Sequence, residues 1–268
     1  MTTATLTEFA PGLAIQGFTA PLSLSQFKLI AFDMDSTLIN IECIDEVADH
    51  ALAFILAITR QVVPNALHLR QRQWGLATPL SSMASLKHLT VGIVGFGRIG
   101  RDVVTRLLAF KAKVLVFDPV VGADEIARSG AVAVASFEEL LEHSDIVSPH
   151  CPSTPKTQQL FNAAAFAKMK TGSIFINVGR GDLVDSAAIT AALQSGHLAG
   201  AALDVFNPEP IPADHPIRTM PNVILAAHIA SASPPSVKTL RESAARIALQ
   251  AVRGELPPNI VNGVNAPR

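Results

Sequence analysis

Apolar residues follow a regular strand–helix rhythm along the part of the chain that begins near Leu89. Short runs rich in Val, Ile, Leu and Ala predict strands at Thr90–Val94, Lys113–Phe117, Ala131–Ala135, Asp145–Ser148, Ser173–Asn177, Ala201–Val205 and Asn222–Ala226. Helical stretches lie between most of these runs or follow the last one, at Ile99–Phe110, Ser136–His143, Ser186–Ser195 and Ser236–Arg253. Because strands that alternate with helices form βαβ units, the pattern predicts an α/β fold with a doubly wound parallel sheet.

The first 88 residues show a different pattern. Met1–Ser25 is a weakly patterned lead-in, and the apolar run Phe27–Phe32 predicts one strand. Apolar residues then recur at helical spacing, which predicts a single long helix from about Glu42 to Arg60. Pro64 and Pro79 are expected to break the chain before the parallel sheet begins.

Composition and charge exclude several classes of protein. Hydrophobic residues make up 49% of the chain and charged residues 16%. A disordered chain has low hydrophobicity and high charge, so this composition excludes one. With 21 Lys and Arg against 22 Asp and Glu, there is no basic excess to bind nucleic acid. The apolar runs are far shorter than the ~20 residues of a membrane-spanning helix, and the acidic start of the chain is unlike a signal peptide. Two cysteines are too few for a disulfide framework, so we expect a cytoplasmic protein.

A glycine-rich turn follows the first strand of the predicted sheet. Gly95, Gly97 and Gly100 form a G-x-G-x-x-G pattern, in which glycines allow a tight turn, close approach to a pyrophosphate, and helix–strand packing. The next strand ends in Asp118, whose carboxylate would bind a ribose 2′-hydroxyl and repel a 2′-phosphate. The pattern therefore predicts NAD rather than NADP as cofactor, although Asp118 alone is also typical of a solvated turn before Pro119.

Three polar residues follow late strands of the predicted sheet, where open α/β sheets bind their ligands. Arg180 could hold a substrate carboxylate, and His228 could accept a proton near neutral pH. A carboxylate such as Glu209 could orient the imidazole and favour its protonated form. Each has a structural alternative, because a histidine at a strand end is often a core residue and a Glu between prolines is often solvated.

These residues belong to an ordered series of motifs: Gly95–Gly100, Asp118, His150–Pro152, Asn177–Gly181, Leu203–Phe206 with Glu209–Pro210, and His228–Ala230. From about His50 to Asn262 the chain resembles the D-isomer-specific 2-hydroxyacid dehydrogenases. The resemblance implies a Rossmann domain in which Arg180 binds substrate, His228 is the acid/base and Glu209 tunes it. It further implies that Asp204 contacts the nicotinamide amide and that Cys151 is a packing residue. The implied cofactor-binding residues are Gly95, Gly97, Arg98, Ile99, Gly100, Asp118, His150, Cys151, Pro152, Val178, Gly179, Arg180, Asp204 and His228.

The N-terminal part departs from that family, because almost all of the family's N-terminal substrate domain is absent from the resemblance. Residues from about Leu22 to Asp49 instead resemble the opening of phosphoserine phosphatases of the haloacid-dehalogenase type. That resemblance implies Asp33 as nucleophile, Asp35 as general acid/base, Mg²⁺ between them, and Glu42 facing the substrate. The rest of a phosphatase is not found, since Gly181–Asp185 is one residue short of the second acidic motif. Phosphatase activity is therefore a remote alternative. The structural interpretation of Asp33 and Asp35 is a solvated turn at the end of a strand, and no metal site is expected.

These observations predict four segments along the chain. They are a phosphatase-like fragment (1–48), an interdomain helix with a dimerisation segment that runs through Trp74 (49–88), an NAD-binding domain (89–233), and a C-terminal helix and tail (234–268). The predicted activity is NAD-dependent oxidation of a small D-2-hydroxy acid, or reduction of the corresponding 2-keto acid, in a homodimer. The alternative is a catalytically silent, dimeric NAD-binding module. Which 2-hydroxy acid is bound stays open.

Overall fold

The computed structural model describes residues 6–10, 13–16, 43–71 and 73–252. The chain divides into two compact units, one made of Met1–Glu42 with Ser233–Arg268 and the other of Cys43–Ala232. Within the first unit, β1 (Leu6–Ala10) pairs with β2 (Leu13–Gln16) in antiparallel register, and α9 spans Pro234–Val252. The weakly patterned lead-in thus contains two strands that the sequence did not predict. The predicted strand at Phe27–Phe32 lies outside the described residues.

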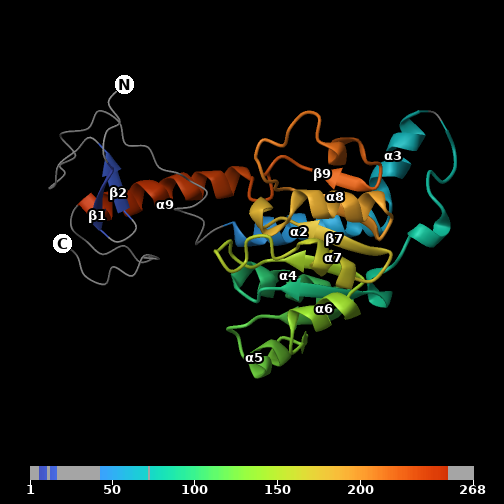
Figure 1. Ribbon diagram of the computed structural model, residues 1–268, viewed down its shortest axis with the longest axis horizontal. Helices are drawn as coiled ribbons and strands as arrows, with labels where there is room; N and C mark the ends of the chain where they lie inside the picture. The colour runs from blue at the N-terminus through green and yellow to red at the C-terminus, as the bar shows by residue number, and fades with distance from the viewer. Residues whose placement is uncertain (1–5, 11–12, 17–42, 72, 253–268) are drawn as a thin grey trace. The chain divides into compact units, whose positions relative to one another are not determined.

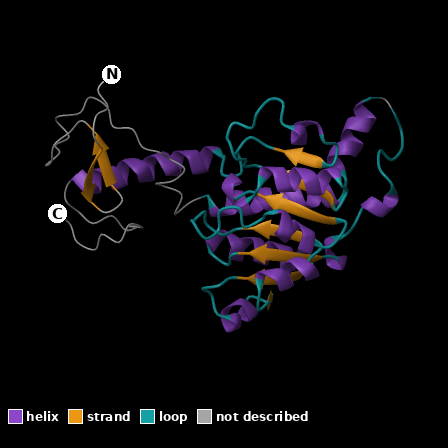
Figure 2. Ribbon diagram, viewed as in Figure 1, coloured by secondary structure: helices purple, strands orange, loops and turns teal. Residues whose placement is uncertain are grey.

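The second unit is built on a parallel sheet, whose strands point the same way in Figure 2. The strand order is β5-β4-β3-β6-β7-β8-β9. The chain enters the sheet at the interior strand β3 and extends first to one edge and then to the other, which is the doubly wound arrangement of dinucleotide-binding domains. The predicted fold class is therefore confirmed. The strands are β3 (Thr90–Val94), β4 (Lys113–Phe117), β5 (Val132–Ala133), β6 (Ile146–Pro149), β7 (Ser173–Asn177), β8 (Leu198–Leu203) and β9 (Val223–Leu225).

Helices cover both faces of this sheet, and two apolar clusters lie between the layers (Figure 1). One cluster joins the strands to α2 (Ile44–Thr59) and α4 (Arg98–Ala109). The other joins them to α6 (Phe137–His143), α7 (Ala163–Lys168) and α8 (Ser186–Gln194). Along β7, Phe175 belongs to the second cluster and Ile176 to the first, as expected when successive side chains of a strand point to opposite faces. The remaining elements are α3 (Val62–Arg70), α5 (Ala123–Arg128), η2 (Leu80–Ser82), η3 (Leu86–His88), η4 (Gly181–Leu183) and η5 (Pro216–Thr219).

Helix α2 packs into the first apolar cluster, against α4, β7 and β8. The apolar stripe of α2 is buried. On its polar side, Asp45 and Asp49 pair with Arg106 of α4, which also pairs with Asp102 of its own helix. Among the described residues, no single helix is long and apolar enough to cross a membrane. Within these same residues, α2 and α3 taken together reach that length and composition, and they are bent by 64° at their junction.

The region after α2 corrects one prediction from the sequence. Pro64 does not break the chain there, because it lies in the first turn of α3. A proline is tolerated at that place, since the N–H groups of a helix's first turn have no partner within the helix. The strand predicted at Ala131–Ala135 is reduced to two residues at the edge of the sheet. The predicted division of the chain into four segments stays a prediction.

Candidate active site

The glycine-rich turn lies between β3 and α4, and each glycine has its own steric role. Gly95 has a φ of +99°, and a Cβ there would lie 2.7 Å from the backbone nitrogen of Cys151. A Cβ on Gly100 would collide with the carbonyl oxygen of Gly95, so this glycine brings helix and turn together. A Cβ on Gly97 would meet no atom within 4 Å, because this exposed position faces open space at the N-terminus of α4. The turn therefore fits a pyrophosphate, which would occupy the space beside Gly97 and accept hydrogen bonds from the helix N-terminus.

Asp118 follows β4 and faces the glycine-rich turn. Its Oδ2 accepts the N–H of Phe96 at 2.7 Å, and its Oδ1 accepts those of Val120 and Val121 at 2.8 and 3.0 Å. Burial opposes its ionisation, but these three backbone N–H groups, together with the positive charge of Arg101, hold the pKa of Asp118 below its ordinary value. The side chain is thus an ionised, positioned carboxylate rather than a solvated turn residue. Such a group fits a ribose hydroxyl and disfavours a 2′-phosphate.

His150 and Cys151 follow β6 and close the other side of the turn. The N–H of His150 donates to the carbonyl of Val94 at 2.7 Å, and its Nε2 lies 3.0 Å from the Ser148 hydroxyl. Burial lowers the pKa of His150 to about 4, so the imidazole is neutral at pH 7. Burial, assisted by the negative charge of Asp118, raises the pKa of the Cys151 thiol to about 11. A thiol that stays protonated is a packing group and not a nucleophile, while Pro152 beside it is exposed.

Arg180 lies in the loop that follows β7. Asn177 holds this loop, because its Oδ1 accepts the N–H of Gly179 at 3.0 Å and its Nδ2 donates to the Arg180 carbonyl at 2.9 Å. The half-buried guanidinium of Arg180 donates to the Gly179 carbonyl at 2.8 Å. A Cβ on Gly181 would overlap the backbone of Phe206, so the loops after β7 and β8 touch through their main chains. The Arg180 loop is therefore fixed against the segment that leads to Glu209.

The structure brings Glu209 and His228 together. His228 Nδ1 lies 2.9 Å from Glu209 Oε2, and Glu209 Oε1 accepts the N–H of Phe206 at 2.7 Å. With Nδ1 turned to the carboxylate, Nε2 is the ring nitrogen that can exchange a proton with a substrate. Both side chains are partly open to solvent, at 29% for His228 and 34% for Glu209. Sequence reasoning proposed both residues but could not show this contact.

Asp204 stands behind His228 and holds its backbone. Its carbonyl accepts the N–H of His228 at 2.8 Å, and its two carboxylate oxygens accept those of Ile229 and Ala230 at 2.9 and 2.8 Å. These bonds fix His228 in the left-handed region, with a φ of 54°. Asp204 is fully buried, so in this arrangement it positions the loop. The predicted contact of Asp204 with the nicotinamide amide stays a prediction.

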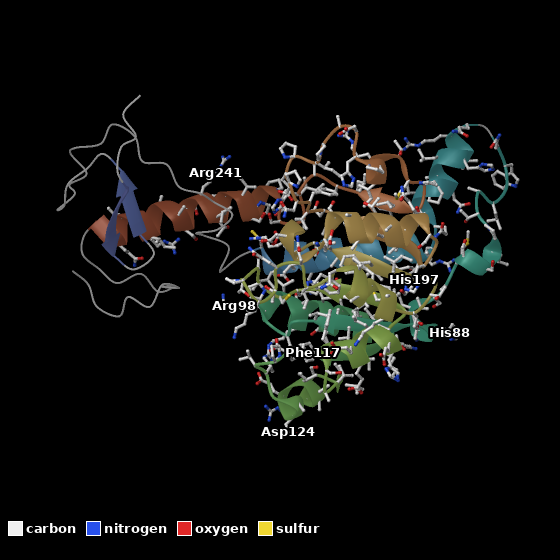
Figure 3. The ribbon with its side chains drawn as sticks, in the orientation of Figure 1. His88, Arg98, Phe117, Asp124, His197 and Arg241 are labelled. Carbon is white, nitrogen blue, oxygen red and sulfur yellow. The ribbon has the colours of Figure 1, made fainter. Side chains whose placement is uncertain are left out.

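All these residues follow the carboxyl ends of the strands. Arg98, which opens α4, lies at the end of the sheet opposite to His88 and His197, which precede β3 and β8 (Figure 3). Ile99 is half-buried beside Arg98, and Val178 is buried directly after β7. The candidate cofactor and substrate residues thus share one edge of the sheet, as the rule for ligand sites in open α/β sheets requires.

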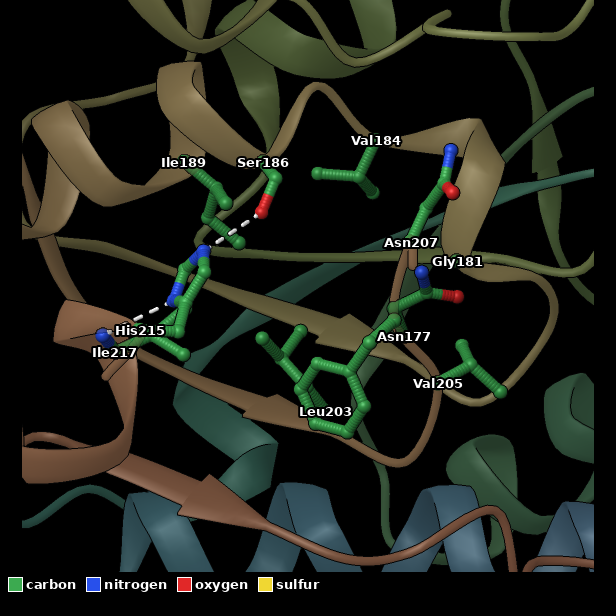
Figure 4. Close-up of a pocket in the computed structure, with 11 residues that line it drawn as sticks. Asn177, Gly181, Val184, Ser186, Ile189, Leu203, Val205, Asn207, His215 and Ile217 are labelled. Carbon is green, nitrogen blue, oxygen red and sulfur yellow. Dashed lines mark hydrogen bonds between the residues drawn. The ribbon is translucent and has the colours of Figure 1, made fainter. Parts of the chain in front are cut away.

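A small cavity of about 20 Å³ lies near this edge, and the sequence had not indicated it. It is large enough for about one water molecule. Figure 4 shows His215 in its wall, with Nδ1 accepting the N–H of Ile217 at 3.3 Å and Nε2 lying 3.0 Å from the Ser186 hydroxyl. Because Nδ1 accepts, Nε2 carries the proton and donates to Ser186, so His215 cannot act as the base of a Ser–His dyad. No motif marks these residues in the sequence.

The phosphatase-like residues Asp33, Asp35 and Glu42 lie outside the described residues, and their resemblance stays a prediction. In the part of the chain that the structure describes, no group of three His, Cys, Asp or Glu residues could hold a metal ion. The acidic pair after Arg180 has other partners: Asp182 accepts a hydrogen bond from Ser153 at 2.5 Å, and Asp185 caps α8. These two carboxylates are therefore used within the loops of the candidate site.

Comparison with known proteins identifies the family. The model of the D-isomer specific 2-hydroxyacid dehydrogenase NAD-binding domain matches residues 52–230. The glyoxylate reductase of Thermofilum pendens is 40% identical, over 81% of this chain and 65% of its own length. The D-3-phosphoglycerate dehydrogenase of Mycobacterium leprae is 37% identical, over 82% of this chain and 41% of its own length. The D-lactate dehydrogenase of Aquifex aeolicus, solved in complex with NAD and lactic acid, is 31% identical, with a TM-score of 0.74 over 83% of this chain and 71% of its own. The chain belongs to the D-isomer specific 2-hydroxyacid dehydrogenase family, and its cofactor is NAD.

The open space beside Gly97 yields a first prediction. Gly97→Ala should weaken NADH binding by about tenfold or more, ~1.4 kcal/mol, because the new methyl group would occupy the space of the pyrophosphate. The fold should be unaffected, since no atom lies within 4 Å of that Cβ. Gly122→Ala is the matched control, because Gly122 also caps a helix, at α5, and also faces open space. Fluorescence titration with NADH measures the effect, and equal affinity in both variants would contradict the predicted cradle.

The neutral state of His150 yields a second prediction. Its folded pKa of about 4 lies below the ordinary value of 6.5, so the unfolded chain binds more protons between these pH values. The buried neutral imidazole therefore carries no penalty above pH 6.5. As the pH falls from 6.5 to 4, the free energy of unfolding decreases by at most about 3 kcal/mol on account of His150. Urea unfolding at a series of pH values should show a shallower decline in His150→Asn than in the parent chain. The exposed His143 provides the control variant, and identical slopes for all three chains would contradict the prediction.

Proposed function

We propose that the chain is an NAD-dependent oxidoreductase that acts on the CH–OH group of a small D-2-hydroxy acid or reduces the corresponding 2-keto acid. The observation that carries this proposal is the His228–Glu209 pair, with 2.9 Å between Nδ1 and Oε2, on the same sheet edge as the glycine cradle. The loop of Arg180 touches the loop that leads to Glu209 through the close backbone contact at Gly181. A proton-exchanging group, a carboxylate-binding group and a cofactor cradle are thus combined at one edge.

The reaction follows from these positions. Bound NAD supplies the hydride acceptor, and NADH the hydride donor. Arg180 holds the substrate carboxylate through its guanidinium, which directs C-2 and its oxygen toward His228. During oxidation His228 Nε2 takes the hydroxyl proton, while the hydride leaves C-2. During reduction His228 returns that proton to the carbonyl oxygen. Glu209 keeps the ring oriented through Nδ1 and stabilises the imidazolium.

The substrate class follows from the carboxylate-binding role of Arg180. A 2-hydroxy or 2-keto carboxylate places its carboxylate next to the reacting carbon, which one guanidinium and one imidazole can address together. Proteins similar to this chain include a glyoxylate reductase and a D-lactate dehydrogenase solved with lactic acid. Glyoxylate and hydroxypyruvate are therefore the first substrates to test.

A silent NAD-binding module is the second candidate, because the glycine-rich turn and Asp118 would suffice to bind the cofactor without any turnover at His228. The chain spans 65% of the length of the glyoxylate reductase and 41% of the phosphoglycerate dehydrogenase to which it is similar. NADH titration beside reduction of glyoxylate and hydroxypyruvate separates the two candidates. Turnover supports the oxidoreductase, whereas tight NADH binding without turnover on either keto acid supports the module.

The acid/base role of His228 yields a third prediction. His228→Ala should lower kcat for keto-acid reduction by about 10²–10⁴-fold, the usual contribution of general acid–base catalysis. NADH affinity should stay within about threefold, because the imidazole acts in the chemical step. His88→Ala, at the other end of the sheet, is the control and should retain full activity (Figure 3). A collapse of NADH affinity in His228→Ala would instead identify this histidine as a structural residue.

We also propose that the chain forms a homodimer through the segment from Val62 to Leu80. Helix α3 has no buried residue, although four of its nine residues are Val or Leu. The apolar exposure continues beyond the helix, with Trp74 94% and Leu80 71% exposed. Several large apolar side chains exposed along one segment are typical of a protein–protein contact, and a second copy of the chain covers them in this proposal.

The dimer yields a fourth prediction. Leu67→Glu should convert a dimer into a monomer, because a buried unpaired carboxylate costs several kcal/mol at an apolar interface. Light scattering coupled to size-exclusion chromatography measures the mass of each variant. Val132→Glu changes a residue of similar exposure on the edge strand β5 and should leave the dimer intact. A parent chain that is already monomeric, or a Leu67→Glu variant that stays dimeric, would contradict the proposed surface.

A further inference from the structure

His50 lies on α2 and points an unused nitrogen at the candidate site. In the described part of the chain its Nε2 is buried without a hydrogen-bond partner, and the nearest acidic atom is Asp204 Oδ1 at 3.8 Å. The ring packs edge-on against Phe54, with 4.3 Å between the ring centroids. Buried polar atoms without a partner are rare in folded proteins, so this nitrogen requires an explanation.

The explanation lies in the environment of Asp204. Its carboxylate is fully buried, and its described hydrogen bonds come from the backbone N–H groups of Ile229 and Ala230. Two neutral donors leave part of a buried negative charge uncompensated. His50 approaches the same carboxylate from α2, and its Nε2–H tautomer would direct an N–H dipole toward Oδ1.

We propose that His50 is a positioning residue for the acid/base His228. It acts through Asp204, whose carboxylate and carbonyl together hold the backbone of His228, Ile229 and Ala230. His50 thus links α2 to the loop that carries His228. Its role rests on the proposed function of His228. The arrangement also keeps the His228 ring in line with Glu209, because the left-handed backbone of His228 depends on the same bonds.

A purely structural role for His50 would come from ring packing on Phe54. Two substitutions separate the alternatives. His50→Phe keeps an aromatic ring against Phe54 and removes Nε2. His50→Gln removes the ring but returns an N–H donor at a similar reach from α2. His88→Phe is the matched control, because His88 is exposed at the other end of the sheet.

The test combines amide hydrogen exchange, followed by NMR, with NADH binding and keto-acid reduction. In His50→Phe the amides of Ile229 and Ala230 should exchange at least about tenfold faster, while those of β3 keep their protection. The NADH dissociation constant should stay within about twofold, and kcat should fall by about ten- to a hundredfold. His50→Gln should restore slow exchange and most of kcat.

Unchanged exchange at Ile229 and Ala230 in His50→Phe would overturn the proposal. A uniform rise in exchange across the sheet, with no rescue by His50→Gln, would also overturn it and identify a packing role. The exchange measurement does not require turnover. A parent chain that reduces no keto acid therefore contradicts the proposed function alone, while exchange still decides the role of His50.

Discussion

The buried carboxylate of Asp204 is the interaction on which the candidate site most depends. It joins the end of β8 to the backbone of Ile229 and Ala230, and the Asp204 carbonyl holds the N–H of His228. A histidine in the left-handed region carries backbone strain of about 1–3 kcal/mol, which only a set of surrounding contacts can maintain. Because a buried carboxylate is costly without hydrogen-bond donors, the bonds from Ile229 and Ala230 favour this arrangement of the loop. His228, the proposed acid/base, is thus positioned by the side chain of Asp204, which solvent does not reach.

The two halves of the site are built in different ways. The cofactor half consists mainly of backbone: Gly95 and Gly100 shape the turn, Gly97 leaves space, and the start of α4 provides N–H groups. Backbone groups suit a pyrophosphate, which needs several donors at close approach. The half that we propose to act on the substrate consists of side chains, namely Arg180, Glu209 and His228, each held by bonds to neighbouring backbone. The contact at Gly181 connects the two loops that carry this half.

The sequence predicted those features that depend on residues close together along the chain. Strands β3, β4 and β7 were located to the residue, because each contains a short run rich in Val, Ile, Leu or Phe. The glycine pattern identified the cradle, since only glycine suits its backbone and its contacts. Features that depend on distant partners escaped prediction: the burial of Asp204, the contact of His50 with it, and the cavity beside His215. Pro64 was misjudged for a related reason, because whether a proline ends a helix or begins one depends on where the helix starts.

The central claim is that this edge of the sheet transfers a hydride between NAD and C-2 of a 2-hydroxy acid with D configuration. It is tested most directly with NADH in which both hydrogens at C-4 of the nicotinamide are deuterium, incubated with the chain and hydroxypyruvate. The account predicts deuterium at C-2 of the glycerate formed and a product of the D configuration. Bound NADH whose deuterium never reaches C-2, or a product of the L configuration, would contradict it.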